Sequence, residues 1–316
     1  MFNIGNLKVN VGEKKQDFVE IYNTGIKVPV TIINGSNEGK TVLITAGIHG
    51  AEYPGIQTAI ELAKELEVKD IKGKLIIISP VNVEAFRARV SEIVPQDGKN
   101  INRIFPGDIE GTLAEQIGHF ITHECQSKAD FYIDMHGGDL HELAMPFVYY
   151  PGIADEKVIN ESKKVAESLN VKYITKSGAK TGAYNSAALR GLPSILIERG
   201  GRGFWTKDEV IEYKKDIKRA LKCLDILDNA EEKIHNPKNI TKATYLESDD
   251  LSGLWYPTVN AGDVVKEGQL IGIMKDFFGN TIKEYYANLH GVVMYMTVSL
   301  SVPKETPLIA YGEIKE

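Results

Sequence analysis

Between residue 41 and about residue 205, short apolar runs alternate with amphipathic helical patterns, and this alternation constrains the fold more than any other feature. The apolar runs are nearly continuous, which is typical of strands that are covered on both faces. They are TVLITAG (41–47), KLIIISPV (74–81), DFYIDMH (130–136), FVYY (147–150) and PSILIERG (193–200). Helical spacing of apolar residues occurs in segments 55–67, 112–126, 156–170 and 207–229. We therefore expect a layered α/β fold.

Two of these helices carry local start signals. Pro54 stands where the first helix would begin, a position that favours proline because the N–H it lacks is not needed there. Thr112 is followed three residues later by Glu115, which is the pattern of a capping box. We expect the helix of segment 112–126 to begin at Thr112.

The pattern changes after about residue 236. The segment HNPKNITKATYLESDD (235–250) is polar and is interpreted as a linker or crossover. Short strand-like runs punctuated by Gly and Pro follow it, which is typical of a small all-β unit. We therefore place a domain boundary near residue 240, between an α/β domain (1–240) and a β-rich C-terminal domain (241–316).

Composition excludes several partners. The formal net charge is −6 and no basic block occurs, which argues against nucleic acid because phosphate binding needs clustered Lys and Arg. The two cysteines, Cys125 and Cys223, predict no disulfide framework and favour a reducing compartment. No apolar run approaches the roughly 18 residues of a membrane helix, and the N-terminus has no signal-peptide pattern. We expect a cytoplasmic protein that does not bind a membrane.

The first candidate site is His49-Gly50-Ala51-Glu52, directly after the strand of residues 41–47. A His and a Glu three residues apart in a loop at a strand end can converge on one cation, and the strand ends of α/β sheets are where ligands bind. The competing interpretation is a surface histidine near a helix start, with Glu52 placed favourably for the helix dipole.

A second histidine follows another strand, in Asp134-Met135-His136-Gly137-Gly138. Two histidines and one carboxylate are a known catalytic zinc set, and Asp134 could orient His136 as an outer carboxylate. The competing interpretation of His136 is a hydrogen-bonded core histidine.

Two further motifs supply polar groups. Glu198 ends the apolar run of residues 193–200, where a buried carboxylate is costly unless it is paired or functional. It is a candidate general base, and the alternative is a salt bridge to Arg199 or Arg202. The loop 97–107, DGKNINRIFPG, contains Asn102 and Arg103, which could hold a carboxylate. DGKN alone is explained by a turn.

The order HGAEYPG, FRAR, DGKNINRIFPG, DMHGG and LIERGG resembles the succinylglutamate desuccinylase/aspartoacylase family, relatives of the zinc metallocarboxypeptidases. The motifs span residues 40–205, and the order of domains extends the resemblance to the rest of the chain. The resemblance implies a zinc-peptidase-like mixed sheet flanked by helices and a small C-terminal all-β domain. Residues 1–240 would be the zinc-dependent catalytic domain.

The resemblance also implies roles for the candidate residues. His49, Glu52 and His136 would ligate one Zn²⁺ per chain, and Glu198 would act first as general base and then as proton donor. The implied activity is cleavage of the amide bond of an N-acyl amino acid, or of a similar carboxylate-bearing substrate, by metal-activated water.

The substrate would be held by residues of the arginine-containing motifs. Asn102 and Arg103 would bind its carboxylate, and an upstream arginine would polarise the scissile carbonyl. Spacing assigns that role to Arg89, with Arg87 as the second choice. Both a deacylase and a metallocarboxypeptidase acting on short peptides need a carboxylate anchor, so the motifs do not separate them. A non-catalytic zinc-binding interaction protein is a third alternative, and a homo-oligomer is compatible with all three.

Remaining features are given plainer interpretations. His119 and His123 are four residues apart and are interpreted as a helix surface, and Gly200–Gly203 as a turn. His141 is placed either at the site or in solvent, and Tyr184 in a loop that could touch substrate. The C-terminal unit also resembles biotinyl and lipoyl carrier modules, but Phe277-Phe278 stands where a carrier lysine is expected, so we interpret the unit as structural.

Overall fold

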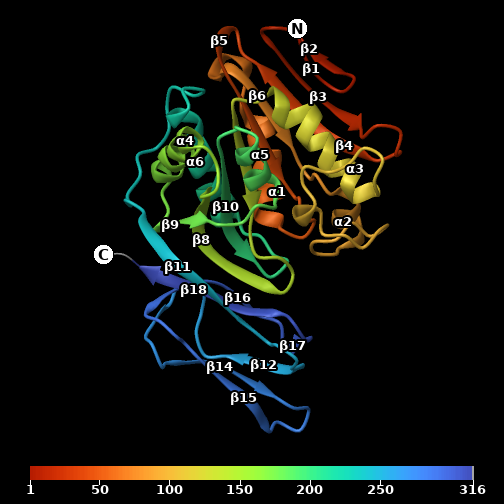
Figure 1. Cartoon of the computed structure of the whole chain (residues 1–316). Helices are drawn as coiled ribbons and strands as arrows, with labels where there is room; N and C mark the ends of the chain where they lie inside the picture. Colours follow the sequence, from red (N-terminus) through yellow and green to blue (C-terminus); the bar gives the residue numbers. More distant parts are fainter. Residues whose placement is uncertain (315–316) are drawn as a thin grey trace.

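The computed structural model, which describes residues 1–314, is built on a mixed sheet of twelve strands (Figure 1). Its central strands are the five predicted apolar runs, in the spatial order β8 (Glu142–Pro151), β10 (Ser194–Gly201), β7 (Phe131–His136), β5 (Asn37–Ala46) and β6 (Lys72–Ile78). β10, β7, β5 and β6 are parallel neighbours, and β8 runs antiparallel to β10. The predicted α/β class is confirmed.

Helices cover both faces of this sheet. They are α1 (Tyr53–Glu65), α2 (Val83–Ala88), α3 (Leu113–Phe120), α4 (Glu156–Ser168), α5 (Ala183–Leu189) and α6 (Lys207–Cys223). Within β5, Ile44 belongs to the core under α1, α4 and α6, whereas Leu43 belongs to the core under α2, α3 and α5. Consecutive strand residues point to opposite faces, so a strand covered on both sides is apolar at every position.

Further strands extend the sheet at both ends. β4 (Lys27–Asn34) and β3 (Glu13–Glu20) follow β6, whereas β9 (Tyr173–Ser177), β11 (Lys238–Glu247), β18 (Pro307–Ile314), β16 (Gly291–Thr297) and β13 (Val264–Val265) lie beyond β8. A separate pair is formed by β1 (Phe2–Ile4) and β2 (Leu7–Val9). The edge strand β3 reads EKKQDFVE, and such charges discourage pairing with other chains but also remove the apolar signal of a strand.

Three sequence-based expectations need correction. The polar segment 235–250 is mostly strand β11, because pairing with β9 and β18 satisfies a backbone whose side chains are largely exposed. Tyr184 lies in helix α5 and not in a loop. The predicted helix 112–126 starts at the Thr112 capping box, but it passes into a π-helix at Ile121–Cys125 and a 3₁₀ turn at Gln126–Lys128.

The described chain from residue 248 onward contains strands and turns without helices. A four-stranded sheet of β15 (Thr281–Tyr286), β14 (Leu270–Lys275), β12 (Gly253–Pro257) and β17 (Ser301–Val302) lies at the end of the molecule opposite the N-terminus (Figure 1). Its core contains the buried Trp255 and includes residues of β16 and β18. The twelve-stranded sheet runs through residue 240, which lies inside β11, and division into two domains there stays a prediction.

Both cysteines are free, Cys125 buried and Cys223 half-buried, which confirms that no disulfide joins them. Among the helices of residues 1–314, none combines the length and apolar character needed to cross a membrane.

Candidate metal centre

The candidate residues meet at the carboxyl ends of three neighbouring strands. His49 and Glu52 lie in the loop between β5 and α1, and His136 is the last residue of β7. Glu198 lies near the end of β10, directly opposite His136 in the parallel ladder. Because these three strands are parallel, residues far apart in the chain reach one edge of the sheet.

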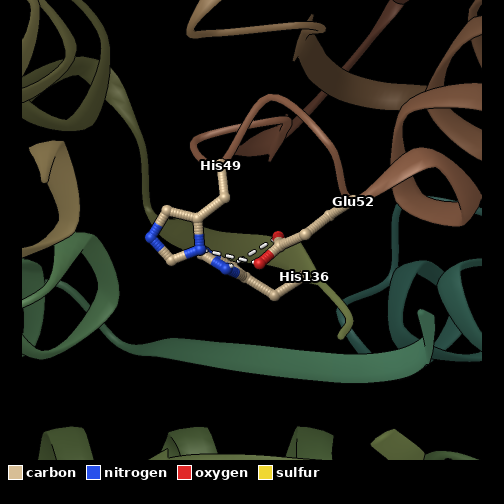
Figure 2. A group of neighbouring side chains, drawn as sticks. All are labelled: His49, Glu52 and His136. Carbon is tan, nitrogen blue, oxygen red and sulfur yellow. Dashed lines mark hydrogen bonds and ion pairs between the residues drawn. The ribbon is translucent and has the colours of Figure 1, made fainter. Parts of the chain in front are cut away.

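The carboxylate of Glu52 faces both imidazoles (Figure 2). Its Oε1 is 2.7 Å from Nδ1 of His49, and its Oε2 is 3.0 Å from Nδ1 of His136. The two rings are nearly perpendicular, with centroids 5.0 Å apart. One ligand atom from each residue lies within 4.8 Å of the others, so the structure brings together all three predicted ligands.

These residues fit a divalent metal ion. Oε2 of Glu52 is buried, and its 3.0 Å contact with Nδ1 of His136 is an ion pair without hydrogen-bond geometry, so a cation would complete the environment of this carboxylate oxygen. Two histidines and one carboxylate are a donor set that zinc accepts. Burial acts to raise the pKa of the Glu52 carboxyl, but His136 and His49 outweigh burial and lower it to about 2. Glu52 is therefore ionised at neutral pH and available as a ligand.

Asp134 contacts His136 on the side of the ring away from Glu52, as its position in the DMH motif suggested. Its Oδ2 is 3.1 Å from Nε2 of His136, and its Oδ1 accepts a 2.7 Å hydrogen bond from the Thr45 hydroxyl. Burial lowers the pKa of His136, but the carboxylates of Glu52 and Asp134 outweigh it and hold the pKa well above its ordinary value. An outer carboxylate of this kind leaves Nδ1 as the nitrogen that faces a metal ion.

Glu198 lies among other carboxylates. Burial raises the pKa of its carboxyl well above the ordinary value, His136 acts in the opposite direction, and the negative charges of Glu52 and Glu142 add to the rise. Burial also raises the pKa of Glu142 to about 8, with Asp139 and Glu92 adding to the rise and Arg103 opposing it. The site therefore concentrates carboxylates that a cation would stabilise in their charged form.

The DGKNINR loop folds against His49 through Asn100, a residue that the motif analysis did not single out. Oδ1 of Asn100 lies 3.3 Å from Nε2 of His49 and accepts a 2.8 Å hydrogen bond from the backbone N–H of Asn102. The side-chain oxygen of Asn102 is occupied elsewhere, accepting a 2.9 Å hydrogen bond from the backbone N–H of Ala183 at the start of α5. Asn102 thus has a structural contact in addition to any contact with substrate.

The arginines are more exposed than the ligands. Arg103 follows Asn102 on a 3₁₀ turn, and its Nη1 lies 3.5 Å from the Asn102 carbonyl. Arg89 is exposed at the end of α2 with a φ of 55°, and no hydrogen bond or ion pair within residues 1–314 joins it to the metal ligands. Arg87 pairs with Glu84 at 3.1 Å. The structure does not bring Arg89 or Arg87 into contact with the ligands, and the role of either stays a prediction.

Other candidates lie apart from this cluster. The rings of His119 and His123 stack with centroids 4.1 Å apart, and Tyr22 hydrogen-bonds to His119 at 2.6 Å. His141 is exposed, whereas Tyr184 is buried in α5. Of the turn predicted over Gly200–Gly203, only Arg202 and Gly203 form a turn, closed by a bridge between Gly201 and Phe204, whereas Gly200 and Gly201 end β10.

Comparison with known proteins identifies the class. A sequence model of the succinylglutamate desuccinylase/aspartoacylase catalytic domain matches residues 38–224, and the chain belongs to this family of hydrolases. It is 27% identical over 301 residues to the N-alpha-acetyl-L-2,4-diaminobutyric acid deacetylase of Halomonas elongata, covering 92% of this chain and 87% of that protein.

Solved structures share the whole fold. A succinylglutamate desuccinylase from Silicibacter sp. TM1040 is 25% identical and has a TM-score of 0.84, with 92% of this chain and 89% of that one covered. The product-bound ectoine utilization protein EutE (DoeB) from Ruegeria pomeroyi has a TM-score of 0.88 at 23% identity, with 97% of both chains covered. The similarity therefore extends beyond the catalytic domain into the C-terminal strands.

Proposed function

We propose that this protein is a zinc-dependent deacylase that cleaves the amide bond of an N-acyl amino acid. The observation that carries the proposal is the convergence of His49, Glu52 and His136 beside Glu198 at one sheet edge. Membership of a family whose named relatives are deacetylases and desuccinylases supports the same reaction class.

His49, Glu52 and His136 would hold one Zn²⁺ per chain. When bound there, the ion would polarise the scissile carbonyl and lower the pKa of water toward 7. Glu198 would accept the proton of the attacking water and return it to the leaving amine. The Glu198 side chain is half-buried, and its place opposite His136 puts it next to the proposed metal site.

Substrate recognition would come from the loops around the site. We propose that Asn102 and Arg103 bind the carboxylate of the amino acid and that Arg89, or alternatively Arg87, approaches the acyl carbonyl. Asn102 is fixed by its bond to α5, so it would present its amide N–H groups from a defined position. Binding energy at the carboxylate would then hold the acyl carbon in place for attack.

The local charge favours one substrate within this class. Burial raises the pKa of Glu142 to about 8, and repulsion from the negative charges of Asp139 and Glu92 adds to the rise. A substrate with a positively charged side chain would relieve that repulsion. The Halomonas elongata relative is named for such a substrate, an acetylated diamino acid. We therefore propose N-acetyl diamino acids as the first substrates to test.

The metallocarboxypeptidase and the non-catalytic zinc-binding protein remain the alternatives. We also keep as proposals a metallocarboxypeptidase-like catalytic domain over 1–240, a C-terminal all-β domain over 241–316 and a cytoplasmic location. The small-molecule partner is part of the same proposal, and a homo-oligomer is compatible with it.

The experiment compares Glu198→Gln with the wild type on N-acetyl-2,4-diaminobutyrate, N-succinylglutamate, an N-acyl aspartate and short peptides. We expect Glu198→Gln to bind Zn²⁺ but to lose about 10²- to 10⁴-fold in kcat, the usual contribution of general acid–base catalysis. Glu284→Gln, at an exposed acid of β15, serves as the matched control with wild-type activity. Equal turnover by Glu198→Gln would exclude the proposed base, and preference for peptides would favour the carboxypeptidase.

A further inference from the structure

Tyr213 of α6 joins the two strands that carry the site. Its hydroxyl lies 2.9 Å from the backbone carbonyl of His136 and 2.7 Å from that of Ile197. Both carbonyls accept, so the single O–H is shared between them. One carbonyl belongs to a proposed metal ligand, and the other belongs to the residue immediately before Glu198.

The position of this hydrogen bond matters because the ladder between β7 and β10 ends there, at the pair of His136 with Glu198. His136 is the last residue of β7, and the register between β10 and β8 shifts between Glu198 and Gly200. Regular ladder bonds fix relative strand positions only where the ladder continues. Tyr213 thus holds the strand ends together at the level where His136 and Glu198 must face one another.

The Tyr213 ring packs against a buried network of charged side chains. The ring is fully buried, and the Arg199 guanidinium lies 5.8 Å from its centroid. Asp216, three residues further along α6, pairs with Arg199 at 2.5 Å and with Arg219 at 3.0 Å. Asp216 also accepts a 2.9 Å hydrogen bond from the backbone N–H of Asn170. This network is buried, so it restricts the ring to one orientation.

We propose that Tyr213 is a positioning residue that sets the distance between the metal ligand His136 and the base Glu198. The inference rests on the proposed function, because it assigns Tyr213 a role in the geometry of that site. Removal of the hydroxyl leaves two carbonyls without this donor and frees the strand ends to separate. A displacement of His136 weakens metal binding, and a displacement of Glu198 slows the chemical step without changing how substrate is held.

Tyr213→Phe tests this role because it removes only the hydroxyl. The matched control is Tyr311→Phe, since Tyr311 is equally buried and its hydroxyl contacts Asn288 at 2.9 and 2.5 Å in the C-terminal part of the chain. The measurements are Zn²⁺ affinity by competition with a chelator, the visible absorption spectrum of Co²⁺-loaded protein, kcat and KM, and Tm.

For Tyr213→Phe we expect about a 10-fold loss of Zn²⁺ affinity, which is the lower end of the effect of outer partners of metal ligands. We also expect an altered Co²⁺ spectrum and a lower kcat with KM within about twofold of the wild type. Tyr311→Phe should lower Tm without changing the affinity or the spectrum. If Tyr213→Phe lowers Tm alone, the residue is merely structural and the proposal is overturned.

Two designs keep the test decisive. If Tyr213→Phe does not fold, Asp216→Asn is measured in its place, because it weakens the ion pair that keeps Arg199 against the Tyr213 ring. An unchanged Co²⁺ spectrum and an unchanged Zn²⁺ affinity in Asp216→Asn overturn the proposal. If the wild type hydrolyses no substrate, the proposed function fails, but the Zn²⁺ affinity and Co²⁺ spectrum still decide whether Tyr213 positions His136.

Discussion

His136 and Glu198 lie directly opposite one another in the parallel ladder between β7 and β10. Paired residues of neighbouring strands project to the same face of a sheet, so this register places the proposed metal ligand and the proposed base on the same face. A slip of one residue would move Glu198 to the opposite face. The apolar contacts that align the central strands therefore bring both residues of the proposed site to the same face of the sheet.

Asp134→Asn should weaken metal binding without disturbing the fold. Asn preserves the shape of the side chain and its contact with Thr45, but it removes the negative charge 3.1 Å from Nε2 of His136. Loss of such an outer carboxylate costs about 10- to 100-fold in metal affinity. Zn²⁺ affinity measured by chelator competition checks this, with Asp17→Asn on the exposed edge strand as control. Equal affinity in the two variants would contradict a role for Asp134.

Two substitutions at Asn102 should separate its structural contact from its proposed contact with substrate. Asn102→Asp retains the oxygen that accepts from Ala183, whereas Asn102→Ala removes it and should cost about 1–2 kcal/mol in the free energy of unfolding. Both variants lack the amide donor, so both should raise KM for an N-acyl amino acid. Urea unfolding and steady-state kinetics check the pair. A wild-type KM in Asn102→Asp would rule out the carboxylate-binding role.

The capping box of α3 should make stability depend on pH. Glu115 accepts from the Thr112 N–H at 2.8 Å and from Lys99 at 2.9 Å, and these bonds lower the pKa of its carboxyl to about 2. Because the folded pKa is below the unfolded value of about 4.3, the contribution of the ionised group is present above about pH 5 and is lost as pH falls toward 2.

We therefore expect the free energy of unfolding to fall less steeply between pH 5 and pH 2 in Glu115→Gln than in the wild type. Urea unfolding at several pH values checks this, with the exposed neighbour Glu110→Gln as control. Parallel pH dependence in Glu115→Gln and the wild type would show that the capping contact does not contribute.

The central strands could be predicted because burial on both faces leaves a continuous apolar signal, as in residues 75–78. β3 and β11 could not, since each is largely exposed and is held by backbone pairing with neighbours distant in sequence. Helix α5 could not be predicted either, because it is short and the residue before it provides no side-chain cap. Its first N–H donates instead to Asn102, which lies in a loop distant in sequence.

The residues of the candidate site also differ in how far they could be predicted from the sequence. His49, Glu52 and His136 could be predicted because each follows an apolar strand within a recognisable motif. Tyr213 could not, since it acts from a helix 77 residues beyond His136 and only the tertiary fold places its hydroxyl there. Asn100 lies inside the predicted loop, and its contact with His49 depends on how that loop folds back.

Titration of chelator-treated protein with Zn²⁺, while hydrolysis of an N-acyl amino acid is followed in the same samples, tests the central claim most directly. The account predicts binding of one Zn²⁺ per chain, with activity rising to a plateau at one equivalent, and loss of both in His136→Ala. Full hydrolysis by the metal-free chain, or wild-type Zn²⁺ binding by His136→Ala, would contradict it.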